Sequence, residues 1–160
     1  MDRVVDTNIA VIANGRETTA SGACQIKDIE FLEALVEKDR TVIDAGNEVL
    51  TEYRKRLKAE GQPGLGDLFF RHLLDNQGNA KSVRVVDGND ARADNLRHAF
   101  THGNLSAFDL SDRPFAVCAV VGRARVATAT DSDWLDHEVG LQACGIRIDF
   151  ICGKAAATKA

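Results

Sequence analysis

The chain has 160 residues, and 44% of them are apolar. This is enough for one compact domain with a core and too little for two ordinary domains. There are 20 Lys and Arg residues against 24 Asp and Glu, so the formal net charge is -4. This balance excludes a disordered polyelectrolyte and a strongly basic coat protein for nucleic acid. It leaves room for a nucleic-acid enzyme, because a bound metal ion can supply positive charge locally.

Short apolar strands alternate with longer segments of helical periodicity. In chain order, we expect a strand at 4–5, a helix at 26–37, a strand at 40–44, helices at 47–58 and 67–74, a strand or covered edge segment at 83–86, a helix at 115–121, a strand at 125–130, a helix at 133–143 and a strand at 146–152. This alternation predicts an α/β/α sandwich with a mostly parallel sheet. We expect one domain over 1–152 and a flexible tail over 153–160.

The cysteines and the apolar runs bear on the cellular compartment. No C-x-x-C pair occurs among Cys24, Cys118, Cys144 and Cys152, so we expect reduced thiols of a cytosolic protein, three of them core filler, and no zinc site. The longest apolar run, 115–121, is far shorter than the roughly 20 residues of a membrane span. Met1 leads almost directly into a strand, so no signal peptide is expected. The predicted location is cytoplasmic.

Acidic residues follow several of the predicted strands. Asp6 follows the first strand, Asp44 ends the second, and Asp131 and Asp133 follow the strand at 125–130. Capping of the next helix explains a single acid at each place. It does not explain a doubled acid or an acid inside a helix. Since the functional crevice of a parallel sheet lies beyond the carboxyl ends of its strands, the conjunction of these acids predicts a functional site there.

Helix geometry separates two glutamates and orients one aspartate. At about 100° per residue, Glu52 lies about 115° from the centre of the apolar face of its helix and Glu48 about 155°. Glu48 is therefore expected to face solvent, and Glu52 to border the crevice. Asp112 shares a helix face with Phe115 and Ala119 and should point inward, which is costly unless it meets a cation. Converging carboxylates predict a divalent ion that prefers oxygen ligands, Mg²⁺ or Mn²⁺.

Four motifs in order resemble the PIN-domain nucleases (VapC-like ribonucleases). They are Asp6-Thr-Asn8 after the first strand, Asn47-Glu-Val-Leu-Thr-Glu52-Tyr-Arg on a helix, Ser111-Asp112-Arg-Pro-Phe-Ala-Val-Cys-Ala119, and Thr128-Ala-Thr-Asp131-Ser-Asp133-Trp134. The resemblance covers the chain from about Val4 to Cys152. It implies a PIN-like α/β/α sandwich whose acidic cluster holds one or two Mg²⁺ or Mn²⁺ ions and hydrolyses RNA phosphodiesters.

Carried over by motif, the core catalytic acids would be Asp6, Glu52, Asp112 and Asp131. The metal ligands would be Asp6, Asp112, Asp131 and Asp133, with Asp133 either an additional ligand or a group behind the ligands. Asn8 would orient Asp6 or a water molecule. Family members include toxins of toxin–antitoxin pairs, so an antitoxin protein and a homodimer are candidate partners besides RNA. The long segment from Gly61 to Asp90 departs from minimal toxins.

The remaining assignments concern RNA contact and proton transfer. Arg56, one turn from Glu52, and Arg113, beside Asp112, are the candidate phosphate contacts, although a charge run is usually a solvated helix face. Asp131, or Glu52 through a water molecule, could act as general base. Trp134 could stack on a base or belong to the core.

Two rival functions come from other classes. A phosphatase of the haloacid-dehalogenase type would also place Asp6 after the first strand, but it needs a second acid where this chain has Asn8. A catalytically silent PIN-fold binding module would use the same scaffold for recognition. The presence of every acid that the chemistry requires argues against it.

Overall fold

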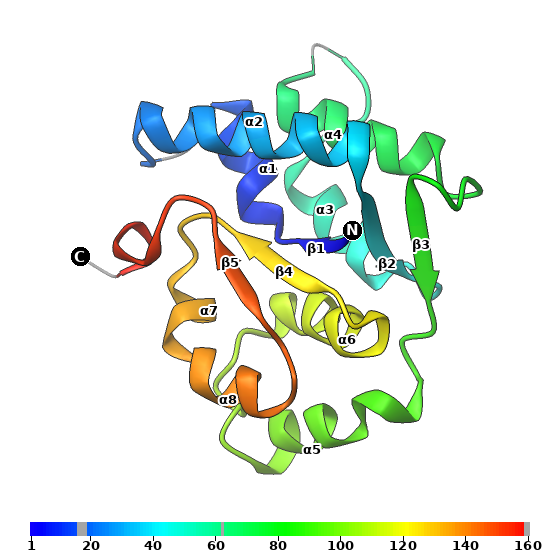
Figure 1. Cartoon of the computed structure of the whole chain (residues 1–160), viewed down its shortest axis with the longest axis vertical. Helices are drawn as coiled ribbons and strands as arrows, with labels where there is room; N and C mark the ends of the chain where they lie inside the picture. Colours follow the sequence, from blue (N-terminus) through cyan, green and yellow to red (C-terminus); the bar gives the residue numbers. More distant parts are fainter. Residues whose placement is uncertain (16–18, 62, 159–160) are drawn as a thin grey trace.

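The structure is a computed structural model that describes residues 1–15, 19–61 and 63–158. A five-stranded sheet lies at its centre (Figure 1). The strands are β1 (Asp2–Val5), β2 (Arg40–Asp44), β3 (Val83–Val86), β4 (Arg125–Thr128) and β5 (Ile148–Phe150). They run in the order β3-β2-β1-β4-β5, and every neighbouring pair is parallel.

The strand order places a crevice at one point of the sheet. The chain adds β2 and β3 on one side of β1, and then returns to add β4 and β5 on the other side. Ligands of such sheets bind where the order reverses, beyond the carboxyl ends of the two strands at that point. Here those strands are β1 and β4, whose last paired residues are Val5 and Ala127.

Helices cover both faces of the sheet (Figure 1). One face carries α1 (Thr7–Asn14), α2 (Gly22–Lys38) and α4 (Leu65–Asp75), and the other carries α5 (Asp94–His102), α6 (Arg113–Gly122), α7 (Ser132–Asp136) and α8 (Glu138–Ala143). The helix α3 (Glu48–Arg56) follows β2 and contacts α1, β2 and α6. Short 3-10 turns lie at Ala91–Ala93 (η1), Leu110–Asp112 (η2) and Lys154–Ala157 (η3). The structure is therefore an α/β/α arrangement around an all-parallel sheet, as the strand–helix alternation predicted.

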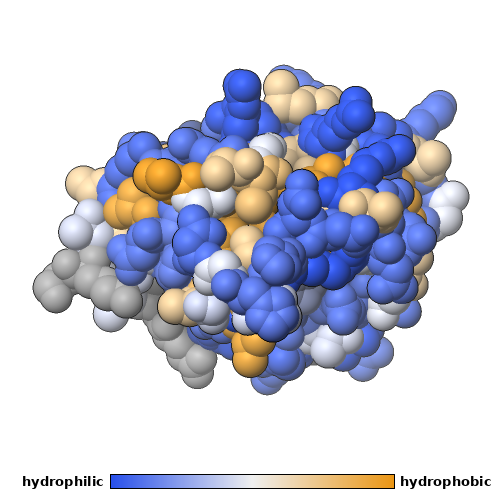
Figure 2. Space-filling view, turned by 90° about the horizontal axis from the view of Figure 1, so that it is seen from below, coloured by the Kyte–Doolittle hydropathy of each residue, from blue (hydrophilic) through white to orange (hydrophobic). Residues whose placement is uncertain are grey.

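The surface on the side of α5 is mostly hydrophilic, with hydrophobic side chains in small separate groups (Figure 2). The apolar residues of α5 itself, Leu96 and Phe100, are buried against the core. Among the described residues, no helix has the length and apolar character that a bilayer crossing requires.

Several predicted elements differ from the observed ones. The helix α1 was not predicted, because its run Ile9–Ala13 is buried on all sides and shows no periodicity. The helix α5 was not predicted either, since Leu96 and Phe100 are its only buried residues. The helix expected over 133–143 is interrupted at His137, whose ring contacts the carbonyl of Asp133 at 2.9 Å. In the expected tail, η3 packs on α7 and Ala157 is buried, while residues 159–160 lie outside the described residues.

The expectation of four reduced thiols is wrong for two of them. Cys24 on α2 and Cys152 after β5 form a disulfide, while Cys118 and Cys144 are free. The two partners are 128 residues apart in the sequence. Only the packing of α2 beside the end of β5 brings them together, so no local spacing could announce the pair.

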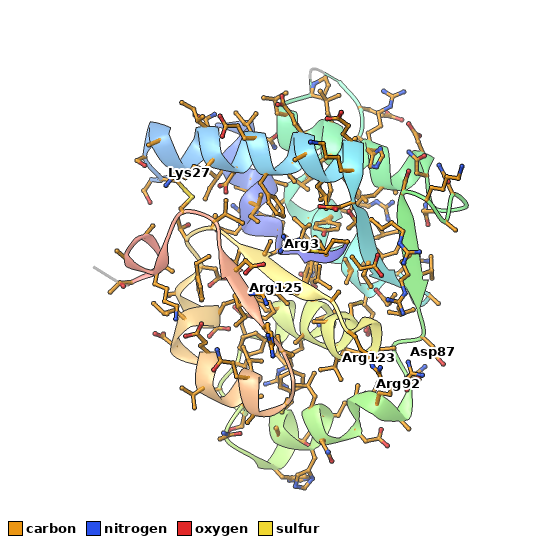
Figure 3. All side chains as sticks on the ribbon, viewed as in Figure 1. Arg3, Lys27, Asp87, Arg92, Arg123 and Arg125 are labelled. Atoms are coloured by element: carbon orange, nitrogen blue, oxygen red, sulfur yellow. A yellow bond between two sulfur atoms is a disulfide. The ribbon has the colours of Figure 1, made fainter. Side chains whose placement is uncertain are left out.

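Basic side chains along the strands are paired within the sheet. Arg3 of β1 and Arg125 of β4 are register partners, and both form ion pairs with Asp149 of β5 (Figure 3). At the start of the sheet, Asp2 accepts from Arg40 at 2.7 Å and from Arg84 at 2.9 Å. These four strand arginines are therefore paired with two acids of the sheet itself, each acid shared by two guanidinium groups.

The crossing of α1 and α4 depends on a glycine. A Cβ atom at Gly66 would lie 1.8 Å from the carbonyl oxygen of Ala10, whereas a Cβ at Gly78 would meet nothing within 4 Å.

We expect Gly66→Ala to lower the free energy of unfolding by about 1–3 kcal/mol or more through overpacking. Gly78→Ala, the matched control, should stay within about 0.5 kcal/mol of wild type. Urea denaturation measures both, and equal stability of the two variants would contradict the close crossing.

Candidate functional site

Three carboxylates meet beyond the carboxyl ends of β1 and β4. Asp6 directly follows β1, Asp131 comes after β4, and Asp112 ends η2 at the start of α6. One carboxylate oxygen from each lies within 4.8 Å of the other two. Asp6 is 2% exposed and Asp112 7%. Two of the strand-end acids, Asp6 and Asp131, therefore do come together with the inward-facing Asp112 at the point where the strand order reverses.

Asp6 is held by the strand beside it. Its backbone N–H donates to the carbonyl of Ala127 at 2.9 Å and extends the pairing of β1 with β4. Its side chain accepts a 2.7 Å hydrogen bond from the buried hydroxyl of Thr128. The hydroxyl of Tyr53 on α3 donates to the carbonyl of Val5 at 2.6 Å and ties the end of β1 to α3. The carboxylate thus projects from rigid, fully hydrogen-bonded backbone.

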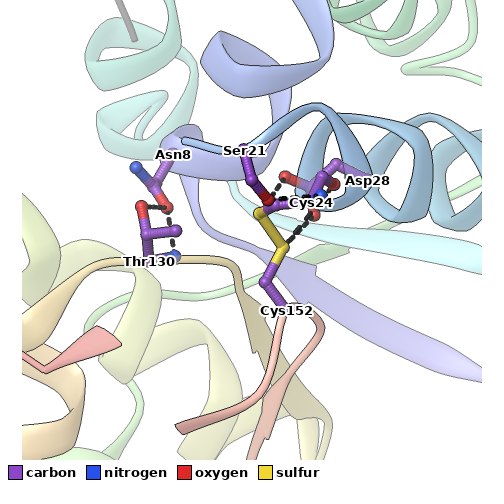
Figure 4. The surroundings of a disulfide bond; sticks show 6 residues. All are labelled: Asn8, Ser21, Cys24, Asp28, Thr130 and Cys152. Carbon is purple, nitrogen blue, oxygen red and sulfur yellow. Dashed lines mark hydrogen bonds between the residues drawn. A yellow bond between two sulfur atoms is a disulfide. The ribbon is translucent and has the colours of Figure 1, made fainter. Parts of the chain in front are cut away.

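Asn8 holds the loop that carries Asp131. Its side-chain oxygen accepts from the backbone N–H of Thr130 at 2.7 Å and from the hydroxyl of Thr130 at 3.2 Å (Figure 4). The resemblance assigned Asn8 to orienting Asp6 or a water molecule. The side chain instead fixes the residue before Asp131, and only the backbone N–H of Asn8 acts on Asp6, where it lowers the pKa.

Capping accounts for some of the acids and leaves others free. Asp44 accepts from the N–H groups of Glu48 and Val49 at the start of α3, and Asp109 accepts from the N–H and hydroxyl of Ser111. Asp131 accepts from the N–H of Asp133 at the start of α7. Asp6 and Asp112 precede α1 and α6, but neither side chain makes a capping hydrogen bond of normal geometry. The N–H groups of Thr7 and Asn8 only lower the pKa of Asp6, and burial outweighs this effect. Capping therefore does not explain the two most buried acids of the group.

Burial and the charges of neighbouring aspartates raise the pKa values of all three carboxyl groups. Burial, followed by the charge of Asp131, raises the pKa of Asp6 to about 7. Burial, followed by the charges of Asp6 and Asp131, raises the pKa of Asp112 to about 10. The pKa of Asp131 is also raised, chiefly by burial. In the described part of the chain, no Lys, Arg or His forms an ion pair with any of the three.

A pocket of about 360 Å³ opens over the three acids. It is lined by Asp6, Thr7, Asn8, Val11, Glu52, Lys55, Arg56, Asp109, Ser111, Asp112 and Asp131. Glu52 borders it with 16% of its side chain exposed, and Lys55 holds its carboxylate at 2.7 Å. Glu48 is exposed and does not line the pocket, as the helix geometry predicted.

Asp133 and Arg113 lie near the pocket but are engaged elsewhere. The carboxylate of Asp133 accepts from the backbone N–H of Asp109 at 2.8 Å and lies 3.2 Å from the ring of His137. Asp133 therefore belongs neither to the group of three acids nor to the lining of the pocket. The Arg113 guanidinium donates to the carbonyls of Ser106 and Phe108 and lies over the Phe100 ring. It stabilises the turn before α6 and does not line the pocket.

Other residues at or near the pocket were missed or left open by the sequence analysis. Thr128 lies in the Thr-Ala-Thr-Asp motif but was not assigned a role. The feature that could have indicated one is a hydroxyl group at the last position of a buried strand. Lys55 follows Glu52 at the i,i+3 spacing that favours ion pairs. Trp134 is fully buried and packs edge-on against Phe108, with 5.0 Å between the ring centroids. Trp134 is therefore a core residue.

Comparisons with known proteins add no assignment: no family model matches the chain, and no curated protein or solved structure matches it either.

The raised pKa values predict how stability depends on pH in the absence of metal. Asp6 and Asp112 titrate near 4 when unfolded but at about 7 and about 10 when folded, so the folded protein binds more protons above pH 4. The free energy of unfolding should therefore fall as pH rises from 5 to 8. Chemical denaturation in EDTA at both pH values measures this.

Substitution isolates the contribution of one acid. Asp112→Asn mimics the protonated carboxyl group, so at pH 8 in EDTA it should be more stable than wild type and should show a shallower pH slope. Asp87→Asn, at an exposed acid after β3, should leave the slope unchanged. An Asp112→Asn protein that is less stable than wild type at pH 8 would argue against electrostatic crowding at the site.

Proposed function

We propose that the protein is a Mg²⁺- or Mn²⁺-dependent ribonuclease of PIN-like architecture. The observation that carries the proposal is the meeting of Asp6, Asp112 and Asp131 within 4.8 Å of one another at the reversal point of the sheet. Three like charges at that separation, two of them buried, require a cation to be ionised together. The four motifs that resemble PIN-domain nucleases supply the reaction class.

The donor set fits a hard cation. All three side chains offer carboxylate oxygen, which Mg²⁺ and Mn²⁺ prefer over nitrogen or sulfur. Three protein ligands also suit Mg²⁺, because this ion usually keeps several water molecules. The pocket of about 360 Å³ beside the acids has room for these waters and for a phosphate group.

In this proposal the acids at the pocket and the residues that hold them have separate tasks. Asp6, Asp112 and Asp131 would hold the ion, and Thr128 and Asn8 keep two of them in place. The ion would stabilise negative charge on the phosphate oxygens and lower the pKa of water. Glu52, at the pocket border and ion-paired with Lys55, would accept the proton of the attacking water. Asp131 is the other candidate for this step.

Lys55 and Arg56 would bind the nucleic-acid backbone. Both line the pocket and extend from the exposed end of α3. The chain carries a net charge of -4, so the basic surface is local. We infer that few phosphates are contacted and that the substrate is a flexible single strand which can bend into the pocket. A cytoplasmic location stays a prediction from the sequence.

The phosphatase alternative is weakened by one residue. It needs a second acid two positions after Asp6, and the side chain there, Asn8, is committed to Thr130. A catalytically silent binding module would have the same fold and the same acids. Only an assay of RNA cleavage therefore distinguishes it from the proposed nuclease. Assignment to a toxin–antitoxin pair stays a prediction from the resemblance, and co-purification of a small DNA-binding protein encoded beside it would support that role.

Cleavage of RNA is expected to require the three acids. Wild-type protein with Mn²⁺ should degrade a labelled single-stranded RNA, and EDTA should stop the reaction. Asp6→Asn and Asp112→Asn should lower the rate by about 100-fold or more, because metal stabilisation of transition-state charge is worth several kcal/mol and about 1.4 kcal/mol corresponds to a factor of ten. The measurement is the initial rate of product formation on a denaturing gel.

Two neighbouring glutamates on α3 provide a matched control for this assay. Glu52→Gln should slow cleavage, whereas Glu48→Gln, on the exposed side of the same helix, should not. Equal RNA loss with wild type, Asp6→Asn and Asp112→Asn would reveal a contaminating nuclease. A folded wild type that binds Mn²⁺ but leaves RNA intact would favour the silent binding module.

Salt dependence tests the proposed phosphate contacts. Each contact to a single strand contributes a slope of about -0.7 to a plot of log K against log salt. Removing one charge by Arg56→Gln should therefore make the slope shallower by about 0.7. Arg113→Gln should change the slope little, because its guanidinium is engaged with protein carbonyls. Fluorescence anisotropy with RNA and the Asp6→Asn protein measures binding without cleavage.

A further inference from the structure

A second group of metal-binding side chain types lies away from the pocket. Cys24 and Asp28 are one turn apart on α2, and Cys152 follows β5 (Figure 4). One possible ligand atom from each lies within 4.8 Å of the other two. Asp28 has no exposed surface, and Cys24 is 5% exposed. The buried carboxylate points at the two sulfur atoms.

The contacts of Asp28 suit reduced sulfur. Asp28 Oδ2 lies 3.8 Å from Cys24 Sγ, and Asp28 Oδ1 lies 3.7 Å from Cys152 Sγ. These contacts are hydrogen bonds only if the sulfur carries a proton, and a disulfide sulfur carries none. In the described part of the chain, Asp28 has no other hydrogen bond or ion pair. In the oxidised protein this buried carboxylate therefore lacks a donor.

A buried polar group without a partner is costly, and a buried charge costs more. Burial, followed by the charge of Asp6, raises the pKa of Asp28 to about 7. A thiol pair would satisfy the carboxyl oxygens, and a cation between the three groups would neutralise them. The position of Asp28 is thus explained by a state other than the disulfide.

The distances are close to those of a zinc site. With Zn–S near 2.3 Å and Zn–O near 2.1 Å, a tetrahedral ion separates sulfur from oxygen by about 3.6 Å and the two sulfurs by about 3.8 Å. The oxygen–sulfur separations of 3.7 and 3.8 Å already agree with this. Only the sulfur–sulfur separation must increase, which rotation of the two cysteine side chains can provide once the covalent bond is broken.

We propose that Cys24, Asp28 and Cys152 form a binding site for a thiophilic divalent cation such as Zn²⁺ when the disulfide is reduced. Water can complete a fourth position, because a cavity of about 430 Å³ adjoins Cys24 between Ser21, Thr130 and Ala157. The absence of a C-x-x-C motif had argued against zinc in the sequence. The ligands come instead from one turn of α2 and from a segment 124 residues away from Asp28.

The disulfide state and the cation-bound state are linked by thiol–disulfide exchange followed by cation binding. A dithiol reductant transfers two electrons and two protons to the disulfide, which yields two cysteine thiols and an oxidised reductant. Binding of the cation then releases both thiol protons, and the Asp28 proton where it is present, to solvent. In either state the end of β5 stays tied to α2. Because disulfides are rare in the cytosol, the reduced state is the one that a reducing compartment would favour.

Cobalt provides a direct test, because thiolate ligation of Co²⁺ gives charge-transfer absorption that carboxylates do not. Protein reduced with a phosphine and desalted without oxygen should bind one equivalent of Co²⁺ with this absorption, and Zn²⁺ should displace it. The oxidised protein should show none. Cys24→Ser should abolish the band, and Asp28→Asn should weaken affinity by at least about tenfold.

Matched variants separate this site from the others. Cys144→Ser and Cys118→Ser should retain the full band. Asp112→Asn should also retain it, so failure of this site and failure of the proposed nuclease are distinguishable. Circular dichroism checks whether Cys24→Ser folds. If this variant does not fold, the proposal is tested by comparing the Co²⁺ band of reduced wild type with that of oxidised wild type and with that of reduced Asp28→Asn. Absence of the band in reduced wild type, or its loss in Cys144→Ser, would overturn the proposal.

Discussion

Electrostatic crowding of carboxylates is the constraint on which the candidate site depends. Asp6, Asp112 and Asp131 lie within 4.8 Å of one another, and two of them are almost completely buried. Burial and repulsion both favour the protonated form, which the raised pKa values express. A cation bound between these three groups would stabilise their ionised forms and so stabilise the folded protein. The metal proposal follows from this balance of charge.

The surrounding structure makes that crowding rigid. The pairing of β1 with β4 places Asp6 beside Thr128, and the side chain of Asn8 connects the start of α1 to Thr130. Capping bonds in the loops are made mainly by other acids, such as Asp44 and Asp109. The acids at the strand ends therefore divide into those that stabilise helix starts and those that remain for a ligand. Asp131 does both, since one oxygen caps α7.

The sulfur group on α2 follows the same logic with different chemistry. Asp28 is a buried carboxylate without a cation, but its neighbours are two sulfurs rather than other acids. Hard oxygen ligands suit Mg²⁺ or Mn²⁺, and thiolates suit Zn²⁺. The charge of Asp6 contributes to the raised pKa of Asp28, so the two groups influence each other electrostatically. Occupancy of one would therefore change the proton affinity of the other.

Local pattern was sufficient for the alternating α/β architecture, for the bounds of β2 and β3, and for the choice of Glu52 over Glu48, because these depend on periodicity within a few residues. It was insufficient for α1 and α5, whose apolar residues show too little contrast, and for the break at His137. The choice of Asp6, Asp112 and Asp131 from the larger set of candidate acids, and the Cys24–Cys152 bond, were decided by tertiary structure. Both join segments distant in sequence, and only strand order and helix packing determine which distant segments become neighbours.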